Sequence, residues 1–553
     1  MTRLRLDLAL LPVLVLAAVL APRLRLPRAF RSLRRALDGI AQRRALAPVL
    51  VGLVCTAAAA ILSLAPALPE PRVHDEFSYR LAADTYAGGR LANPPHPMWK
   101  HLEAFHVLQQ PTYASKYFPA QGVFLAAGTV LAGHPIAGVW LATGLAAAAI
   151  CWMFYAWFPP RWALRGALLA GATMVFSYWS TSYWGGSVAA LGGALVYGAL
   201  RRILRRPRVA TAIALACGLC LLAASRPFEG LVASLPAAAV LGLWLAGERR
   251  PPLRLALTRI ALPLLAALLV AGAAALAYNR AVTGDPLLTP YELYEETYNG
   301  PPSFIWQSPP PETAQRHAIF QAIYGGWAQR IYRLQQSPAG LLEMAALKLR
   351  TFWVFFLGVL LSIPLVTQWR LLTEDPWMRL AALTVALVLV ANLVVTWVST
   401  AHYRAPITAL VFVLVTQALR RLRLWQRRTR GTGRVLAALI PLFSVCALAS
   451  ASVAKRYAER DGWHYQRARL LASLERDGAR HLVIVRYGAS HNAHQDWVSN
   501  RADVDGSAVV WARDMGPQRN APLLEYFGDR RVWLLQPDPL PARLEPYPLA
   551  RTP

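Results

Sequence analysis

A pair of adjacent carboxylates follows the first long apolar run of the chain. The stretch "RVHDEFSYR" places Asp75 and Glu76 just beyond an apolar segment at 45–68, which is long enough to cross a bilayer. A carboxylate at the outer end of a membrane helix can act as a general base on a hydroxyl group. Helical spacing would put Asp75, Tyr79 and Tyr86 on one face and turn Glu76 aside. Of this candidate catalytic pair the spacing favours Asp75, and the alternative is that both acids are merely solvated.

A lone lysine marks the next polar stretch, "SKYFPAQG". Lys116 stands in a chain whose cations are mostly arginine, and Tyr117, Phe118 and a helix-starting Pro119 follow it. An ammonium group is a compact partner for phosphate, and aromatic side chains favour the headgroup depth of a bilayer. We therefore expect Lys116 and Tyr117 to bind a lipid phosphate. The alternative is a lysine that only anchors a helix end in the interface.

Two further turns between apolar runs carry cations that could hold a headgroup. "SRPFEG" places Arg226 at the top of one run and Glu229 at the start of the next, and a guanidinium there can bind phosphate through two hydrogen bonds. An Arg226–Glu229 pair that closes the turn explains the pattern equally well. "AHYRAP" brings His402, Tyr403 and Arg404 to the top of a late run. A belt of aromatic and cationic interface residues is the alternative there.

Several histidines and tyrosines of the outer loops have plainer interpretations. His96, His101, Glu103 and His106 could suggest a metal, but His101 and His106 lie five residues apart, so we interpret them as solvated loop residues and expect no metal site. Whether a divalent metal assists as a cofactor is left open by the sequence. The tyrosines of "YELYEETY" recur at helical spacing, which is typical of sugar-stacking stripes and of membrane interfaces. We favour the interface.

Composition decides the class of protein that must position these residues. Of the 553 residues, 56% are hydrophobic and 16% are charged, which is typical of a protein that crosses a membrane many times. The net charge of +29 comes from arginine clusters in short loops between apolar runs, such as "RRILRRPR" and "GERRPPLR". Such clusters mark the cytoplasmic side of membrane proteins, so nucleic acid is excluded as a partner and the lipid bilayer is expected.

The apolar runs predict the membrane-spanning helices. We expect spans near 45–68, 134–158, 163–178, 183–200, 209–225, 229–247, 256–277, 350–368, 378–398, 404–420 and 433–451. The N-terminal run adds a short span or an interfacial helix, and we expect 119–133 to lie in the interface. The arginine clusters then share the inner side, and the candidate residues share the outer side. The spans hold almost no ionisable residue, which disfavours an ion-coupled transporter.

The last hundred residues have the composition of a soluble domain. "HLVIVRY", "SAVVWAR" and "RVWLLQP" predict short buried strands, and "APLLEYFGDR" predicts a helix between the last two. Alternating strands and helices predict a small α/β domain. The predicted fold class is an all-α membrane protein of about 11–13 transmembrane helices with this extracytoplasmic domain. Its parts are an N-terminal hydrophobic segment and basic loop at 1–44, a membrane domain at 45–452 with outer loops 69–133 and 278–349, and the α/β domain at 453–553.

The order of these elements resembles that of a known superfamily. A first span that ends in "HDE", an outer loop that closes on "SKYFP", a short helix, many spans and a soluble tail resemble the GT-C membrane glycosyltransferases. The branch of protein O-mannosyltransferases and lipid A aminoarabinose transferases is the most similar. The resemblance implies a polyprenyl-phosphate sugar as donor and transfer with inversion outside the cytoplasm. It also implies that Asp75 matches the first-loop acid and Lys116 a position near the donor phosphate.

The chain departs from that branch at one turn. The branch commonly carries an Asp after its third or fourth span, where this chain has "SYWSTSYWGGS" without an acid. We expect Tyr183, Trp184 or Ser187 to supply that contact with the donor, unless it is missing. The first outer loop is also longer than in the branch.

These observations lead to one expected function and two alternatives. We expect a transferase that moves a sugar from a polyprenyl-phosphate donor to an envelope glycan, lipid or protein, at the outer face of the inner (plasma) membrane. One alternative is a protein that binds or flips lipid-linked glycans without catalysis. The other is a ligase or polymerase that uses prenyl-diphosphate oligosaccharides.

Overall fold

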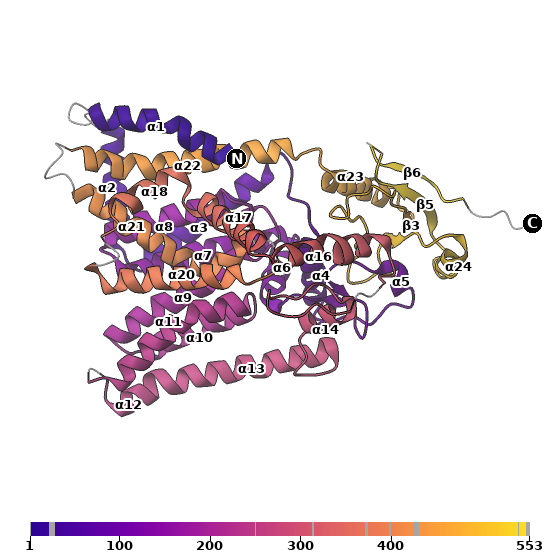
Figure 1. Cartoon of the computed structure of the whole chain (residues 1–553), viewed down its shortest axis with the longest axis horizontal. Helices are drawn as coiled ribbons and strands as arrows, with labels where there is room; N and C mark the ends of the chain where they lie inside the picture. Colours follow the sequence, from indigo (N-terminus) through magenta and orange to yellow (C-terminus); the bar gives the residue numbers. More distant parts are fainter. Residues whose placement is uncertain are drawn as a thin grey trace, which may run out of the picture.

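Apolar helices pack side by side at one end of the molecule, and a small sheet stands at the other end (Figure 1). The computed structural model describes residues 2–20, 28–248, 250–311, 314–370, 374–397, 400–424, 431–539 and 541–548. Between the helical bundle and the sheet lies a middle part, which includes α4 (His74–Ala87), α5 (Trp99–Leu102), α14 (Pro290–Tyr298) and α16 (Gln329–Leu334). The three layers follow one another along the longest axis.

Eight helical segments of the described chain are long and apolar enough to cross a bilayer. They are α3 (Leu46–Leu64), α7 (Ile136–Trp157), α9 (Gly186–Arg205), α11 (Pro227–Ala246), α12–η2–α13 (Leu253–Thr283), α20 (Pro376–Leu393), η4 with α21 (Ala401–Leu424) and α22 (Thr432–Ala458). Two further predicted spans correspond to α8 (Pro160–Val175) and α10 (Val209–Ala223), which have only 16 and 15 residues. A protein that crosses the membrane several times is confirmed, but fewer helices qualify than the eleven to thirteen we expected, because several are shorter than the hydrocarbon core requires.

The predicted span 350–368 is wrong as a single helix. The chain there forms α17 (Pro338–Phe356) and α18 (Gly358–Thr367), which meet at an angle of 93°. Gly358 has a φ of +58°, and a Cβ at that position would lie 2.3 Å from Asp7 Oδ2. The same carboxylate accepts a hydrogen bond of 2.9 Å from the backbone N–H of Val359. Hydropathy could not reveal this break, because a contact with the N-terminal helix α1 (Thr2–Leu20) holds it.

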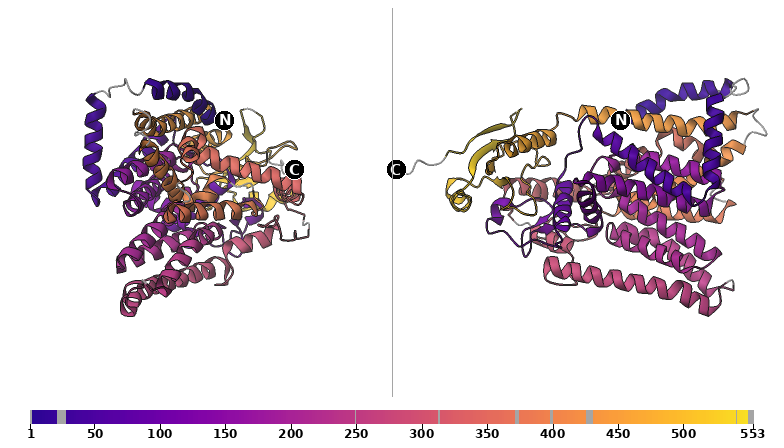
Figure 2. Two further views of the ribbon diagram at one scale, coloured as in Figure 1. Left: turned by 60° about the vertical axis from the view of Figure 1, so that its left-hand side comes forward. Right: turned by 180° about the vertical axis from the view of Figure 1, so that it is seen from behind.

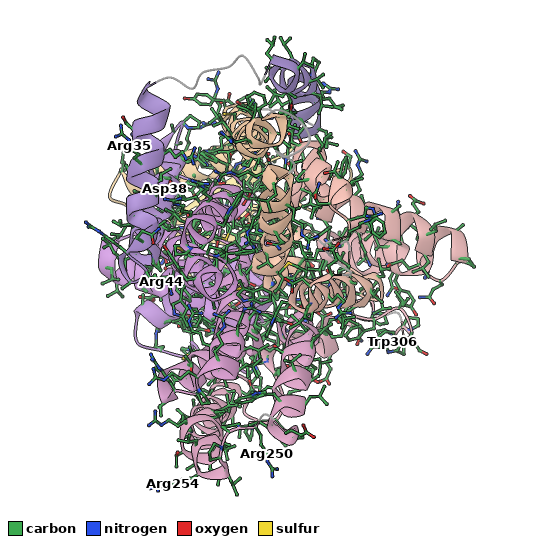
Figure 3. The ribbon with its side chains drawn as sticks, turned by 90° about the vertical axis from the view of Figure 1, so that its left-hand side faces the viewer. Arg35, Asp38, Arg44, Arg250, Arg254 and Trp306 are labelled. Carbon is green, nitrogen blue, oxygen red and sulfur yellow. The ribbon has the colours of Figure 1, made fainter. Side chains whose placement is uncertain are left out.

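Described arginines of several loops and helix ends lie at the end of the bundle opposite the sheet, where Figure 3 labels Arg35, Arg44, Arg250 and Arg254. Helix α2 (Arg28–Gln42) runs across this end, and Figure 3 looks directly at it. Asp38 of α2 pairs with Arg165 at 2.8 Å and with Arg161 at 3.4 Å. At the other end the long helix α13 (Leu262–Thr283) leads into the middle part, as Figure 2 shows from behind.

Short elements join the middle part to the bundle. Strands β1 (Val107–Leu108) and β2 (Ala114–Ser115) pair antiparallel. They precede α6 (Pro119–Ala132), which packs against both α4 and α7. Gly128 and Gly138 allow the close approach of α6 and α7, because a Cβ on Gly128 would lie 2.1 Å from the backbone N of Gly138. The remaining elements of this region are η1 (Tyr178–Ser180), α15 (Ala318–Phe320) and η3 (Gln321–Ala328).

The C-terminal sheet has the order β4-β3-β5-β6. The three predicted strands are confirmed as β3 (His481–Val485), β4 (Val509–Arg513) and β5 (Arg531–Gln536), all parallel, and the predicted helix as α24 (Pro517–Tyr526). The antiparallel edge strand β6 (Arg543–Pro546) and helix α23 (Trp463–Glu475) were not predicted. Helix α22 continues to Ala458, past the expected start of the domain at residue 453.

Candidate active site

Asp75 lies in the first turn of α4, where the middle part meets the helical bundle. The Tyr117 hydroxyl donates a short hydrogen bond to its Oδ1. His106 Nε2 lies 3.9 Å from Oδ2. The side chain of Asp75 remains 32% exposed. A helix N-terminus favours a negative charge, so Asp75 combines a fixed orientation with an open approach for a hydroxyl group.

Two histidines stand beside this carboxylate. Burial lowers the pKa of His106 well below its ordinary value, and the charge of Lys116 and the neighbouring His74 act in the same direction. Burial also lowers the pKa of His74 to about 4, while Asp496 and Asp75 oppose that effect. Both imidazoles are therefore neutral near pH 7, so His106 forms no ion pair with Asp75. The Nε2 of His74 donates to the carbonyl of Ala493, which brings the C-terminal domain to the edge of the site.

Lys116 is enclosed by aromatic rings. Its Nζ lies 2.7 Å from Glu295 Oε1, and its side chain is only 4% exposed. The same Nζ stands 4.6 Å from the ring centre of Tyr291 and 4.5 Å from that of Tyr294, both on α14. It lies 5.6 Å from the ring of Tyr117, whose hydroxyl binds Asp75. The ammonium group is thus a cation held by Glu295 and by the tyrosine rings, and not a lysine that reaches into the interface.

Arg226 completes the positive side of the site. It caps α11, and its guanidinium lies 4.4 Å above the ring of Tyr403. Within the described residues no carboxylate forms an ion pair with Arg226, and Glu229 acts on it only as a nearby charge. Burial is the main cause that raises the pKa of Tyr79. The positive charge of Arg226 acts against this rise and the negative charge of Asp75 adds to it, so both groups lie near this tyrosine. The ring of Tyr79 stacks on Tyr117 at 4.5 Å. Arg226 and Asp75 thus act in opposite directions on the same tyrosine, whose neighbour Tyr117 binds Asp75.

The η4 turn (Ala401–Ile407) brings the other predicted residues to the same boundary. His402 Nδ1 lies 3.0 Å from the Tyr178 hydroxyl, and its ring is 4.7 Å from that of Trp184. Arg404 is only 1% exposed and donates to the carbonyl of Thr400. It also interacts electrostatically with Glu229, which is buried. The structure thus gathers Arg226, Glu229, His402, Tyr403 and Arg404 next to Asp75 and Lys116.

Glu76 and Tyr183 have a different surrounding from Asp75. Glu76 is only 3% exposed, and its two oxygens accept hydrogen bonds from the backbone N–H groups of Tyr183 (2.9 Å) and Arg72 (3.2 Å). Burial raises the pKa of Glu76 to about 7 against those hydrogen bonds. The Tyr183 hydroxyl donates to the carbonyl of Pro69, and its ring is fully buried. These contacts tie the start of α4 to the turn before α9 and use the hydroxyl of Tyr183 within the fold, whereas Glu76 also lines a cavity.

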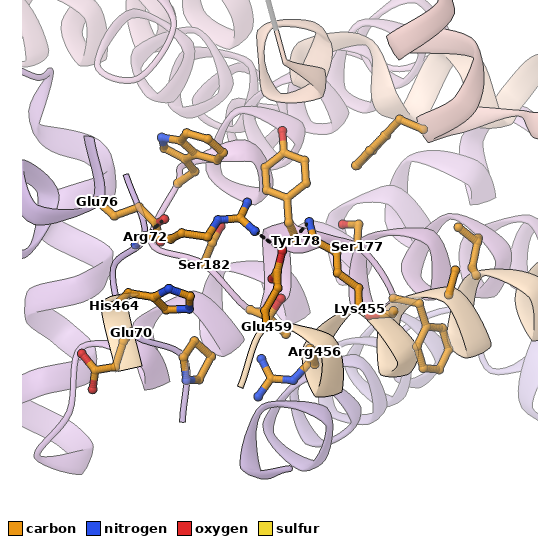
Figure 4. Close-up of a pocket in the computed structure, with 18 of the residues that line it drawn as sticks. Glu70, Arg72, Glu76, Ser177, Tyr178, Ser182, Lys455, Arg456, Glu459 and His464 are labelled. Carbon is orange, nitrogen blue, oxygen red and sulfur yellow. Dashed lines mark hydrogen bonds and ion pairs between the residues drawn. The ribbon is translucent and has the colours of Figure 1, made fainter. Parts of the chain in front are cut away.

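A cavity of about 230 Å³ lies on the Glu76 side of this turn. Figure 4 shows Arg72, Lys455, Arg456 and Glu459 along its polar wall. Arg72 and Glu459 form an ion pair of 2.5 Å. Trp184 also lines the cavity, and its buried Nε1 has no hydrogen-bond partner among the residues that the structure describes. Trp184 thus lies between this cavity and His402.

Several residues of the site were misjudged from the sequence. Tyr291, Tyr294 and Tyr298 were assigned to a membrane interface, but they are packed in the middle part, and the first two surround Lys116. His96, His101 and His106 were interpreted as solvated, yet all three are largely buried. Glu295, the partner of Lys116, was not singled out at all. The helical spacing of "YELYEETY" was the signal that could have found α14, although not its neighbour.

The ionisable groups of the site suit chemistry on a hydroxyl group beside an anion. Among the residues that the structure describes, no three His, Cys, Asp or Glu side chains are grouped so that they could hold a metal ion. The site instead offers an oriented carboxylate, an ammonium and a guanidinium, with buried tyrosines between them. Such a set can take a proton at Asp75 while the cations stabilise a negative leaving group.

Comparisons with known proteins give a distant likeness. No protein-family model matches the chain, and no curated protein matches it. Crystal structures of ArnT from Cupriavidus metallidurans are similar at 12% sequence identity. The one bound to undecaprenyl phosphate has a TM-score of 0.44 and covers 89% of this chain and 92% of that chain. The apo structure has a TM-score of 0.43, with 88% and 92% covered. At this level of similarity no residue role is transferred, and the chain is identified here by its architecture, a helical multi-pass membrane protein with a C-terminal α/β sheet.

Proposed function

We propose that the protein is a membrane glycosyltransferase. It takes a sugar from a polyprenyl-phosphate donor and transfers it, with inversion, to an envelope acceptor at the extracytoplasmic face of the inner (plasma) membrane. The observation that supports the proposal is that Tyr117 links a carboxylate to a cation, because its hydroxyl binds Asp75 and its ring lies 5.6 Å from the Lys116 ammonium, while Arg226 and Asp75 both act on Tyr79. Helix α4, which carries Asp75, lies at the end of the bundle away from α2. A lipid donor reaches this level with its chain among the helices and its headgroup in the middle part.

Asp75 serves as the general base. The acceptor hydroxyl attacks the anomeric carbon of the donor, its proton passes to Asp75, and the bond between that carbon and the phosphate oxygen breaks. The Tyr117 hydroxyl holds the carboxylate in place through Oδ1, which leaves Oδ2 for the incoming hydroxyl. The polyprenyl phosphate leaves as an anion. Proton transfer by a positioned carboxylate contributes about 10²–10⁴-fold to such a step.

Lys116 and Arg226 are the cations proposed to hold the donor phosphate. Lys116 has its charge fixed by Glu295 and by the aromatic rings, so it is in place before the donor binds. Arg226 lies over Tyr403 with no paired carboxylate among the described residues, and its guanidinium can take two phosphate oxygens. Arg404 is more buried and binds a backbone carbonyl, so its proposed role is to position Glu229 and the η4 turn.

The test is transfer of label by the purified protein in lipid. A panel of polyprenyl phosphates that carry radiolabelled hexoses or pentoses is incubated with an extract of envelope material as acceptor. We expect label to move to an acceptor with the wild type and not with Asp75→Asn. Asp84→Asn is the matched control, because Asp84 lies on the same helix and pairs with Arg501 outside the site.

The second measurement is the amount of labelled donor that remains bound to the protein. Asp75→Asn is expected to retain the labelled donor as the wild type does, because the proposed phosphate contacts remain. If neither protein consumes any donor of the panel, the transferase is rejected in favour of a lipid-binding protein. If Asp75→Asn transfers label at the wild-type rate, the proposed base is rejected.

A further inference from the structure

A second cavity lies in the middle part, away from the membrane-spanning helices. Its volume is about 200 Å³, and segments near α5, the end of α14 and residues 314–320 enclose it. Figure 1 places α5 and α14 on the side of the bundle that faces the C-terminal sheet. The exposed rim includes Gln110 and Thr297, so the cavity is open to the outside.

Stacked rings connect this cavity to the catalytic residues. Phe320 forms part of its wall and stacks on Phe105 at 4.2 Å. Phe105 in turn stacks on His74 at 4.2 Å, and His74 directly precedes Asp75. The rings of this stack are buried, so they pack the wall of the cavity against α4, and an acceptor glycan enters the cavity from its exposed rim and not through the stack.

The charges of the cavity are already paired with one another. Glu103 accepts from Arg316 at 3.1 Å and lies 3.0 Å from His317 Nε2. The Tyr298 hydroxyl also donates to Glu103, at 3.2 Å. An ionic ligand would have to break these contacts, so the cavity favours a neutral molecule. This distinguishes it from Arg226, which forms no ion pair with a carboxylate among the described residues.

The groups that remain are an indole ring and side-chain amides. Trp99 lines the cavity half-buried, with the guanidinium of Arg316 at 4.9 Å from its ring. Gln109 is only 3% exposed, its Nε2 donates to the carbonyl of Leu102, and its buried Oε1 has no hydrogen-bond partner in the described part of the chain. Gln110 and Gln315 add further amides. Amides offer donors and acceptors to hydroxyl groups, and an indole offers a face to the apolar side of a sugar ring.

We propose that this cavity is a binding site for one neutral sugar unit of the acceptor. The inference rests on the proposed transferase and deepens it, because it makes the acceptor a glycan that is longer than the unit that reacts. Gln109 Oε1 accepts from a sugar hydroxyl, and Trp99 packs against the ring. The volume suits one monosaccharide unit and not a lipid chain.

Direct binding of sugars tests the proposal without any turnover. The full chain in lipid is titrated with D-glucose, D-galactose, D-mannose and N-acetyl-D-glucosamine, and binding is followed by saturation-transfer NMR. We expect saturable binding of at least one sugar in the millimolar range, as a single sugar unit allows. Trp99→Ala should weaken it at least about tenfold, and Trp99→Phe should keep it within about threefold because an aromatic face remains.

The controls separate this site from the rest of the molecule. Trp306→Ala is the matched control, because Trp306 is 64% exposed and stacks on Phe304 away from the cavity. It should bind the sugar as the wild type does, and so should Asp75→Asn. No saturable binding to the wild type, or equal losses in Trp99→Ala and Trp306→Ala, would overturn the proposal. Sugar binding by a protein that transfers no label would leave the cavity assigned and remove only the transferase.

Discussion

The two faces of the first turn of α4 carry neighbouring carboxylates in opposite surroundings. On one face Asp75 is partly open and receives a hydrogen bond from a tyrosine hydroxyl. On the other face Glu76 is buried and accepts hydrogen bonds from two backbone N–H groups, one of Arg72 just before the helix and one of the distant Tyr183. A step of one residue turns a helical side chain by roughly 100°. Residue type and proximity in sequence thus say little about role, whereas the partner of each oxygen separates a reactive group from a structural one.

The largest expected effect is a difference in the rate of sugar transfer between variants of Asp75 and of Glu76. Asp75→Asn should lower the rate of sugar transfer about 10²–10⁴-fold, because proton transfer to the carboxylate is lost. Glu76→Gln should keep the rate per folded molecule within about threefold, because Glu76 takes no part in the proposed proton transfer and the amide oxygen still accepts from one of the two backbone N–H groups. Initial rates at saturating donor measure both. Equal losses in the two variants would mean that the two faces do not differ in function.

The pH dependence of stability separates the same two faces. The pKa of Glu76 is raised from 4.5 to about 7 by burial, so the folded protein holds a proton that the unfolded chain releases. The stabilisation by this proton is complete below pH 4.5 and is lost as the pH rises through about 7. The difference is at most about 3 kcal/mol. The free energy of unfolding of the wild type in detergent should fall across this window.

The matched variant for that measurement is Glu76→Gln. It should remove this part of the decline, since an amide does not titrate. Asp75→Asn should reduce the decline only slightly, because the Asp75 charge is the smallest of the causes that act on the pKa of Glu76. A decline of the same size in wild type and Glu76→Gln would assign the pH dependence to other groups.

Removing the Glu76 side chain tests its structural role. Glu76→Ala leaves the N–H groups of Tyr183 and Arg72 without an acceptor in a buried place, and we expect a loss of about 2 kcal/mol in the free energy of unfolding. Glu70→Ala is the control, because Glu70 is a partly exposed partner of Arg80 and should cost less than about 1 kcal/mol. Thermal unfolding in detergent measures both. Equal stability of the two variants would contradict the assignment.

Two charged residues of the candidate site, Asp75 and Lys116, were predicted from the sequence alone. Asp75 lies at the start of α4, and Lys116 comes shortly before Pro119, which begins α6. An acid beside an apolar run and a lysine in a chain rich in arginine are both easy to notice in the sequence. Their partners were beyond reach, because Glu295 meets Lys116 across 179 residues. Tyr183 was expected to face the donor, yet its hydroxyl and its N–H are both used within the fold. The spacing of aromatic residues predicts that their rings are buried. The direction in which each ring points depends on the packing of the folded chain.

The same limit applies to the fold. Apolar runs and alternating strands predicted most helices and the core of the C-terminal sheet, since both depend on local periodicity. The bend at Gly358 depends on Arg3 and Asp7, about 350 residues earlier in the chain. No local pattern distinguishes this glycine from others in apolar helices. Long-range polar contacts are therefore what the sequence alone could not supply.

The smallest expected effect concerns the hydrogen bond that orients Asp75. Tyr117→Phe keeps the ring stacked on Tyr79 but removes the hydroxyl that holds Oδ1. We expect transfer to fall about tenfold, or about 1.4 kcal/mol, because the carboxylate remains but is less well positioned. Tyr113→Phe is the control, since it removes a hydroxyl that binds the Asn500 carbonyl outside the site. Unchanged transfer in Tyr117→Phe would mean that the helix alone orients Asp75, and the contrast with Glu76 would then rest on burial.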